Sequence, residues 1–254
     1  MLENKQQALL DYVLRIADNA LILGHRVSEW CGHGPSLETD IGLTNIALDL
    51  VGHSRSLLQY AAEVEDKGRS EDDLAFLRDI REFKNVLLVE QPNGNFAETI
   101  ARQFLYDSFN YHFYAALCNS TDKQLVAIAE KSIKELNYHY RYSAEWVIRL
   151  GDGTPESHKK MQEALNDLWP YAGELFAADD IDKQMHEAGI GVDLAAIKTL
   201  WEERVNAILT EATLIRPADG WIQKGGKQGH HTEQMGLILA EMQWMQRAYP
   251  NMEW

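Results

Sequence analysis

The sequence predicts an all-α protein, a bundle of four long helices followed by additional helices toward the C-terminus. Apolar residues recur every three or four positions over long stretches, which is the period of one face of an α-helix. No strand pattern stands out, although the short apolar run at residues 86–89 is ambiguous by periodicity. At 254 residues, 45% of them hydrophobic, the chain is long enough for one substantial core. We therefore expect a single helical domain over residues 1–254.

The first two helices are separated by a segment rich in helix-ending residues. The apolar series in residues 3–31 predicts the first helix. Gly-His-Gly-Pro-Ser at residues 32–36 supplies a glycine and a proline that end it, and Ser36 can cap the next helix. The second helix is predicted over residues 37–65.

Polar and glycine-containing turns divide the rest of the chain. A short helical or irregular piece is expected at residues 71–84, and the run from Gln91 to Asn95 marks a break. The helices expected after this break cover residues 96–119, a segment that ends at Gly151, and residues 157–178, 193–213 and 232–248.

Composition excludes several classes of partner. With 24 Lys and Arg against 39 Asp and Glu, the formal net charge is −15, which opposes binding to nucleic acid or to an anionic membrane. No stretch approaches the ~18 apolar residues of a membrane span, and the first residues lack the pattern of a secretory signal. We expect a cytoplasmic protein. Cys31 and Cys118 lack metal-site spacing and are expected to be buried thiols.

Five polar residues fall on the inward stripes of the predicted helices. Asp49 and His53 lie on the second helix, Asp107 on the third, and Glu135 and His139 on the fourth. Charge on such a stripe is costly unless it is paired or bound to metal. Di-iron bundles use carboxylates from two helices and a Glu-x-x-His pair from each of the other two, and this set echoes that arrangement.

The spacing of these residues argues against a working di-iron centre. None of the nine histidines has Asp or Glu three residues before it, and both carboxylate-histidine pairs are spaced by four. Asp18 on the first helix is the nearest candidate for the remaining acid. We predict a vestigial polar cluster satisfied by hydrogen bonds, without metal, while a functioning di-iron site remains the alternative.

A glycine-rich stretch precedes the last helix. Lys224-Gly225-Gly226-Lys227 lacks the Gly-Lys-Ser/Thr sequence of a phosphate-binding loop, and no strand leads into it. Its amides, with Lys224 and Lys227, could receive an anion such as a coenzyme A phosphate. The adjacent His230 and His231 are expected to be capping or surface residues.

Four blocks of sequence carry a resemblance to a known family. The run Glu-Gln-Pro-Asn-Gly-Asn-Phe at residues 90–96 is far more specific than any helical pattern. The four blocks are distributed over the whole chain. With them, the sequence resembles the C subunits of bacterial phenylacetyl-coenzyme A epoxidases. The blocks are Glu29-Trp30-Cys31-Gly32-His33 with Leu48-Asp49-Leu50, Leu87 to Phe96, Lys134-Glu135 with Tyr138-His139, and His231-Thr232-Glu233 with Leu239 to Gln243.

The resemblance implies a ferritin-like fold and a non-catalytic structural role. It implies a di-iron catalytic A subunit as partner, with iron in that partner, and other subunits including a reductase that delivers electrons from NADPH. It implies no catalytic, cofactor or metal residues in this chain. Two further hypotheses remain, an autonomous ferritin-like di-iron oxidase or metal-binding protein, and a helical interaction protein outside oxygen chemistry.

Overall fold

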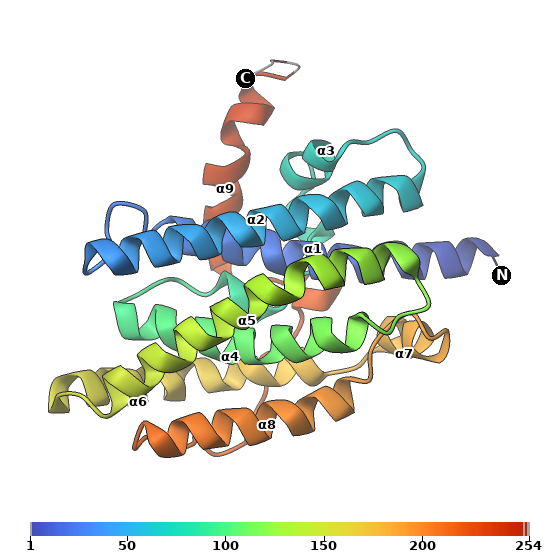
Figure 1. Ribbon diagram of the computed structural model, residues 1–254. Coiled ribbons are helices and arrows are strands. Elements are labelled where there is room, and N and C mark those ends of the chain that lie inside the picture. Colours follow the sequence, from blue (N-terminus) through green and yellow to red (C-terminus); the bar gives the residue numbers. More distant parts are fainter. Residues whose placement is uncertain (1, 251, 253–254) are drawn as a thin grey trace. The chain divides into compact units, whose positions relative to one another are not determined.

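The computed structural model describes the backbone of residues 2–250 and 252, and the side chains of that range from residue 5 onward. Within this range the secondary structure is helical, with no strand (Figure 1). This confirms the predicted all-α class, a ferritin-like helical bundle with additional C-terminal helices. The chain divides into two compact units: unit 1 comprises Met1–Glu90 with Gly225–Trp254, and unit 2 comprises Gln91–Lys224.

Unit 1 is built on two long helices that run antiparallel and side by side (Figure 1). The last helix of the chain returns to this unit and contacts α1, α3, η1 and η2. The elements of unit 1 are α1 (Leu2–Ser28), α2 (Leu37–Glu65), α3 (Glu71–Phe76), η1 (Ile80–Glu82), η2 (Leu87–Glu90), η4 (Gly226–Gln228) and α9 (Glu233–Ala248).

The turn between α1 and α2 has the predicted capping geometry. Gly32 adopts a φ of 80°, a left-handed conformation that favours glycine after a helix end. The Ser36 hydroxyl accepts a hydrogen bond from the backbone amide of Thr39 at 3.3 Å, which satisfies one of the free amides at the start of α2. The predicted Ser36 cap and the bounds of the second helix are therefore confirmed.

Unit 2 contains four long helices that pack on one another. α4 contacts α5, α6 and α8, and α5 also contacts α6 and α8. The elements of unit 2 are α4 (Phe96–Leu117), α5 (Lys123–Gly151), α6 (Pro155–Ala172), η3 (Gly173–Phe176), α7 (Asp180–Glu187) and α8 (Leu194–Glu211).

The segment before α4 is held by a buried arginine. Arg102, fully buried, donates hydrogen bonds to the carbonyl of Gln91 at 2.6 Å and to Oδ1 of Asn93 at 2.7 Å. Asn95 caps α4 in a reciprocal arrangement with Glu98, in which each side chain accepts from the other's backbone amide. The specific sequence of this run thus fixes a turn and a helix start.

Some sequence expectations differ from the structure. The short helix α7 was not predicted, and the helix expected over residues 157–178 ends at Ala172, where the chain continues as η3. The ambiguous apolar run becomes the 3₁₀ helix η2. Apolar periodicity is weak evidence for pieces this short, because fewer than three turns of helix do not define a face.

The expectation that both cysteines are buried was wrong. Cys31 is exposed and Cys118 is half-buried. Both follow the last turn of a long helix, where the chain leaves the packed interior. Partial burial raises the pKa of the Cys118 thiol, with Glu130 contributing in the same direction.

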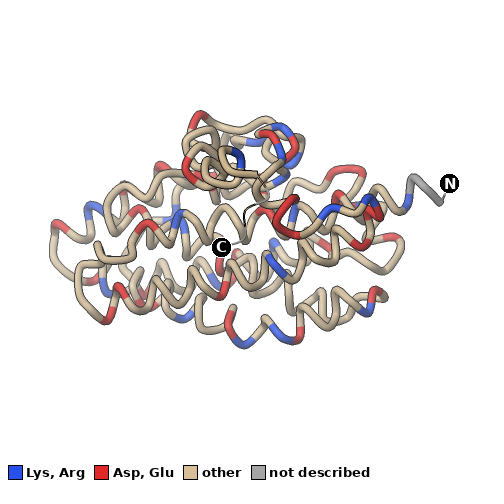
Figure 2. The backbone as a smooth tube through the Cα atoms, turned by 90° about the horizontal axis from the view of Figure 1, so that it is seen from above, with Lys and Arg blue, Asp and Glu red and all other residues tan. Residues whose placement is uncertain are grey.

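The described helices carry charge of both signs, with acidic residues more frequent along the backbone (Figure 2). None of the helices in the described range combines the length and apolar character that crossing a membrane demands.

Candidate functional site

The five residues of the predicted vestigial cluster are distributed over both units. In unit 1, α2 carries Asp49, which is half-buried, and His53, which is buried. In unit 2, Asp107 on α4 and His139 on α5 are buried, whereas Glu135 is half-buried. The structure therefore places three of them on the packed interior of their helices. That all five form one cluster stays a prediction, because it involves both units.

Asp107 is the most perturbed acid of this set. Burial raises its pKa to about 6, although the charge of His139, the adjacent Ser143 hydroxyl and the charge of Arg102 each act to lower it. The hydroxyl proton of Ser143 is directed to the carbonyl of His139 at 3.0 Å. Neither carboxyl oxygen of Asp107 has a hydrogen-bond partner among the described residues. Asp107 and His139 thus form a buried acid-histidine pair within unit 2.

Asp18, the candidate for the remaining acid of a metal site, has a different partner. Its carboxylate forms an ion pair with Arg78, at 3.0 Å from Nη1 and with a second, short bond from Nη2. It also accepts the backbone amide of Lys84 at 2.8 Å. Both side chains of the ion pair are excluded from solvent, at 0% and 1% exposed. A guanidinium therefore supplies the positive charge that balances this buried acid.

The donor set does not match a di-iron carboxylate site. Such a site requires carboxylate and histidine ligands that converge, with Glu-x-x-His pairs on two helices. The pairs here are spaced by four residues, and Asp18 is engaged by Arg78. Among the described residues, no group of three His, Cys, Asp or Glu side chains is arranged to hold a metal ion.

A second buried ion pair, between Glu90 and His231, was not identified from the sequence. Nδ1 of His231 lies 2.7 Å from Oε2 of Glu90, and Nε2 lies 3.0 Å from the carbonyl oxygen of Phe83. Both partners are acceptors when Glu90 is ionised, so this geometry favours the imidazolium form, in which both ring nitrogens donate. Burial alone lowers the pKa of His231, but the hydrogen bond and charge of Glu90, with the Phe83 carbonyl, outweigh it and raise the pKa.

Further donors complete the shell around Glu90. Its Oε1 accepts the backbone amide of Thr232 at 2.6 Å and the Thr232 hydroxyl at 2.8 Å, while Asn85 donates to Oε2 at 2.9 Å. Arg26 binds the backbone carbonyl of Glu90 through Nε and Nη2 at 3.2 and 3.1 Å. The expectation that His231 is a capping or surface residue was therefore wrong. The sequence blocks that contain Glu90 and His231 were the only indication of this pair.

The glycine-rich stretch packs closely against the backbone of unit 1. A Cβ on Gly226 would lie 2.1 Å from the carbonyl oxygen of Asn85, and one on Gly229 would lie 2.2 Å from that of Arg81. These glycines therefore serve close packing. Lys227 is buried and Lys224 is exposed, and they belong to different units. An anion site formed by Lys224 and Lys227 stays a prediction.

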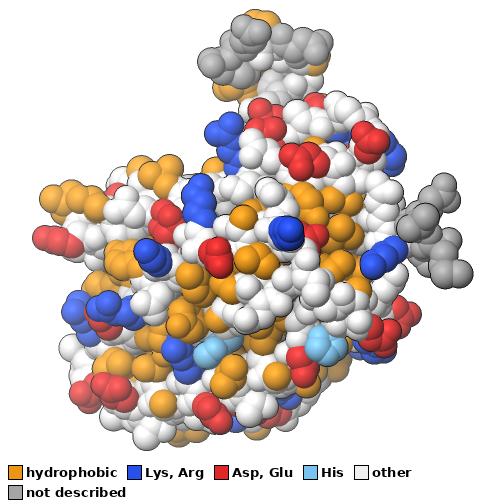
Figure 3. Space-filling view, turned by 45° about the vertical axis from the view of Figure 1, so that its right-hand side comes forward, with side chains coloured by type: hydrophobic (Ala, Val, Ile, Leu, Met, Phe, Trp, Pro, Cys, Tyr) orange, Lys and Arg blue, Asp and Glu red, His pale blue; other side chains and the backbone are white. Residues whose placement is uncertain are grey.

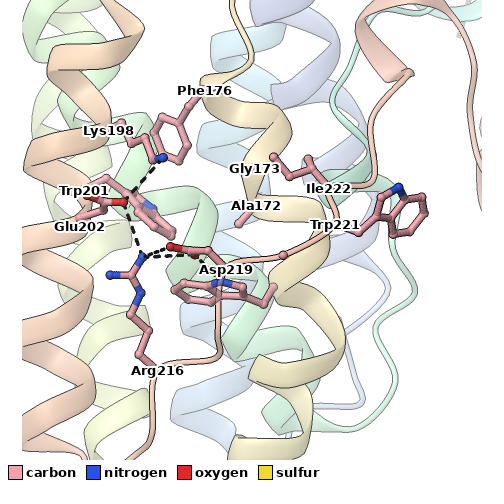
Figure 4. A pocket seen from close by; sticks show the side chains of 12 residues that line it. Ala172, Gly173, Phe176, Lys198, Trp201, Glu202, Arg216, Asp219, Trp221 and Ile222 are labelled. Carbon is pink, nitrogen blue, oxygen red and sulfur yellow. Dashed lines mark hydrogen bonds and ion pairs between the residues drawn. The ribbon is translucent and has the colours of Figure 1, made fainter.

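A pocket of about 110 Å³ lies within unit 2 (Figure 4). Trp169 and Trp201 form its aromatic wall, with ring centroids 5.5 Å apart. Arg216 pairs with Asp219 at 2.9 Å and with Glu202 at 3.5 Å, so the charges at the pocket are balanced internally. The volume is well below the ~300 Å³ of usual small-molecule sites, so the pocket does not fit a substrate as large as an acyl-coenzyme A.

Comparison with known proteins defines the class to which this helical chain belongs. A family model described as phenylacetic acid catabolic protein matches residues 1–254, and the chain belongs to that family. Its sequence is 51% identical over 246 residues to the C subunit of 1,2-phenylacetyl-CoA epoxidase from Escherichia coli (strain K12). The alignment covers 97% of this chain and 99% of that protein. The resemblance noted from the four sequence blocks is confirmed.

Proposed function

We propose that this chain is a structural subunit of a phenylacetyl-CoA epoxidase in aerobic phenylacetate degradation. In this role it performs no chemistry itself and supports a separate di-iron catalytic A subunit. The observation that carries the proposal is the 51% identity to the C subunit of such an epoxidase, which extends over nearly the full length of both chains. Such coverage supports an equivalent role for the whole chain.

The buried electrostatics of the chain support a role without metal. Arg78 neutralises Asp18, and His231 neutralises Glu90, so these two buried acids have protein partners where a metal centre would need free ligands. Iron then belongs to the catalytic partner. Electrons from NADPH reach that partner through a reductase subunit, and the assembly is cytoplasmic.

Co-expression with the catalytic subunit tests this role. We expect the catalytic subunit to be soluble and active with its reductase when this chain is present, and to lose solubility or turnover when it is expressed alone. The assembly should bury more than ~2,000 Å² in total, as permanent complexes do. A catalytic subunit equally soluble and fully active without this chain contradicts the proposal.

A further inference from the structure

The outward side of α2 carries a row of exposed apolar side chains. Leu37, Ile41, Leu48 and Val51 are 72%, 52%, 65% and 42% exposed, and we call these four residues the α2 stripe. With Thr44 between them, they follow the alternating spacing of four and three residues that forms the seam of paired helices. At a rise of about 1.5 Å per residue, the stripe is about 21 Å long.

This stripe is separate from the face through which α2 joins the core. Leu43, Ile46 and Leu50 on the opposite side of the helix are fully buried. Single exposed apolar residues are normal on protein surfaces, but several that share one helix face mark an interaction site. Figure 3 shows one face of the molecule, on which hydrophobic side chains lie exposed between charged groups.

The charges beside the stripe restrict the partner. Glu38 and Asp49 lie along one side of it and Asp40 along the other, and no Lys or Arg occurs between Leu37 and Val51. A partner helix that buries the stripe must approach these carboxylates from both sides. Opposite charges at such flanking positions favour pairing, and like charges oppose it.

A second copy of this chain fits the stripe poorly. In an antiparallel pairing that sets Ile41 against Leu48 of the other copy, like flanks meet, so Asp49 lies opposite the other copy's Glu38. In a parallel pairing, opposite flanks meet, so Glu38 lies opposite the other copy's Asp40. Each copy also carries a formal net charge of −15, so the overall field adds to the repulsion.

We propose that the α2 stripe is the docking face for another subunit of the epoxidase, through a helix with an apolar seam flanked by Lys or Arg. This assignment rests on the proposed function, since it takes the partner to be a subunit of the same enzyme. The stripe supplies the apolar centre of the interface. The carboxylates of Glu38, Asp40 and Asp49 beside it favour a partner that carries Lys or Arg around this centre.

Competition during assembly tests the assignment. Wild-type chain and a Leu48→Asp variant are co-expressed in equal amounts with the tagged catalytic subunit and reductase, and their ratio in the purified complex is measured by mass spectrometry. We expect the purified complex to contain at least about 30-fold less Leu48→Asp than wild-type chain. Loss of a central interface residue weakens binding by about this factor. Asp49→Lys should be depleted as well, because it reverses a flanking charge.

Leu200→Asp provides the matched control. Leu200 on α8 is also exposed, at 44%, but Glu203, which lies one turn further along the same face, is charged. It should be incorporated at a ratio near one. Thermal unfolding of isolated Leu48→Asp should match the wild type, which excludes misfolding as the reason for its depletion.

The remaining outcomes separate the two proposals. Equal incorporation of Leu48→Asp and wild type overturns the docking face while the subunit role stands. Failure of the wild-type chain to enter any complex contradicts the proposed function itself. If sedimentation shows that the chain alone is a dimer and that Leu48→Asp makes it a monomer, the stripe binds a second copy and the proposed partner is wrong.

Discussion

The imidazolium of His231 makes the stability of unit 1 depend on pH. A histidine whose pKa is raised by folding stabilises the fold fully below the unfolded value of ~6.5, and this contribution is lost as the pH rises through the folded pKa. Loss of the proton removes the donor on one side of the ring and leaves Glu90 with a weaker partner. The attachment of the segment before α9 is therefore strongest in mildly acidic solution and weakens as the pH rises through the raised pKa of His231.

Replacement of His231 by Gln should lower the melting temperature at pH 6, because removing one member of a buried ion pair costs on the order of 3–5 kcal/mol. The difference from the wild type should shrink as the pH rises through the raised pKa of His231, because the ring then loses its charge. Thermal unfolding measured across this range checks the expectation. The exposed neighbour provides the control, since His230→Gln should follow the wild-type profile. A constant difference between His231→Gln and the wild type at all pH values contradicts the ion-pair assignment.

At the scale of the elements, local chemistry determined how far the sequence could predict the structure. The start of α2 was predictable because Ser36 and its glycine and proline neighbours act within a few residues of the helix end. The Glu90–His231 pair could not be predicted, because its members are 141 residues apart and neither lies on the apolar face of a predicted helix. Asp18 was placed on the correct buried face, but its partner Arg78 lies in an irregular segment without periodicity.

The start of α4 depends on one arginine, and its removal should be measurable. Arg102→Ala removes the hydrogen bonds to the buried carbonyl of Gln91 and to the half-buried amide oxygen of Asn93, and loss of the buried bond should cost about 1–3 kcal/mol. Unfolding by urea should show this loss. Arg102→Lys should restore only part of it, since an ammonium lacks the planar fork that reaches both oxygens. Arg141→Ala, at an exposed position on α5, should change stability little.

At the scale of the whole molecule, three buried acids of the chain lie beside basic side chains of the same chain. Asp18 and Glu90 each have a cationic side chain as partner, and Asp107 lies beside His139 with a pKa raised toward neutrality by burial. A protein that bound iron at these positions would need the carboxylates to be available as ligands. The electrostatics are therefore consistent with the non-catalytic role that we propose.

The isolated chain should contain no stoichiometric iron after expression in iron-supplemented medium. The physical reason is the spacing of its carboxylate-histidine pairs and the engagement of Asp18 by Arg78. Elemental analysis of the purified protein provides the measurement, with the catalytic subunit analysed in parallel as the positive control. About two iron atoms per chain, as in di-iron bundles, would show instead an autonomous metalloprotein.

The division of unit 1 into two stretches of sequence, with unit 2 between them, determines the order in which the protein can mature on the ribosome. Residues 91–224 emerge as one uninterrupted stretch and can fold as soon as α8 is released. Unit 1 is complete only when residues 225–250 have followed, and until then Glu90 lacks its partner His231. During that interval unit 1 also lacks the contacts that α9 makes with α1 and α3.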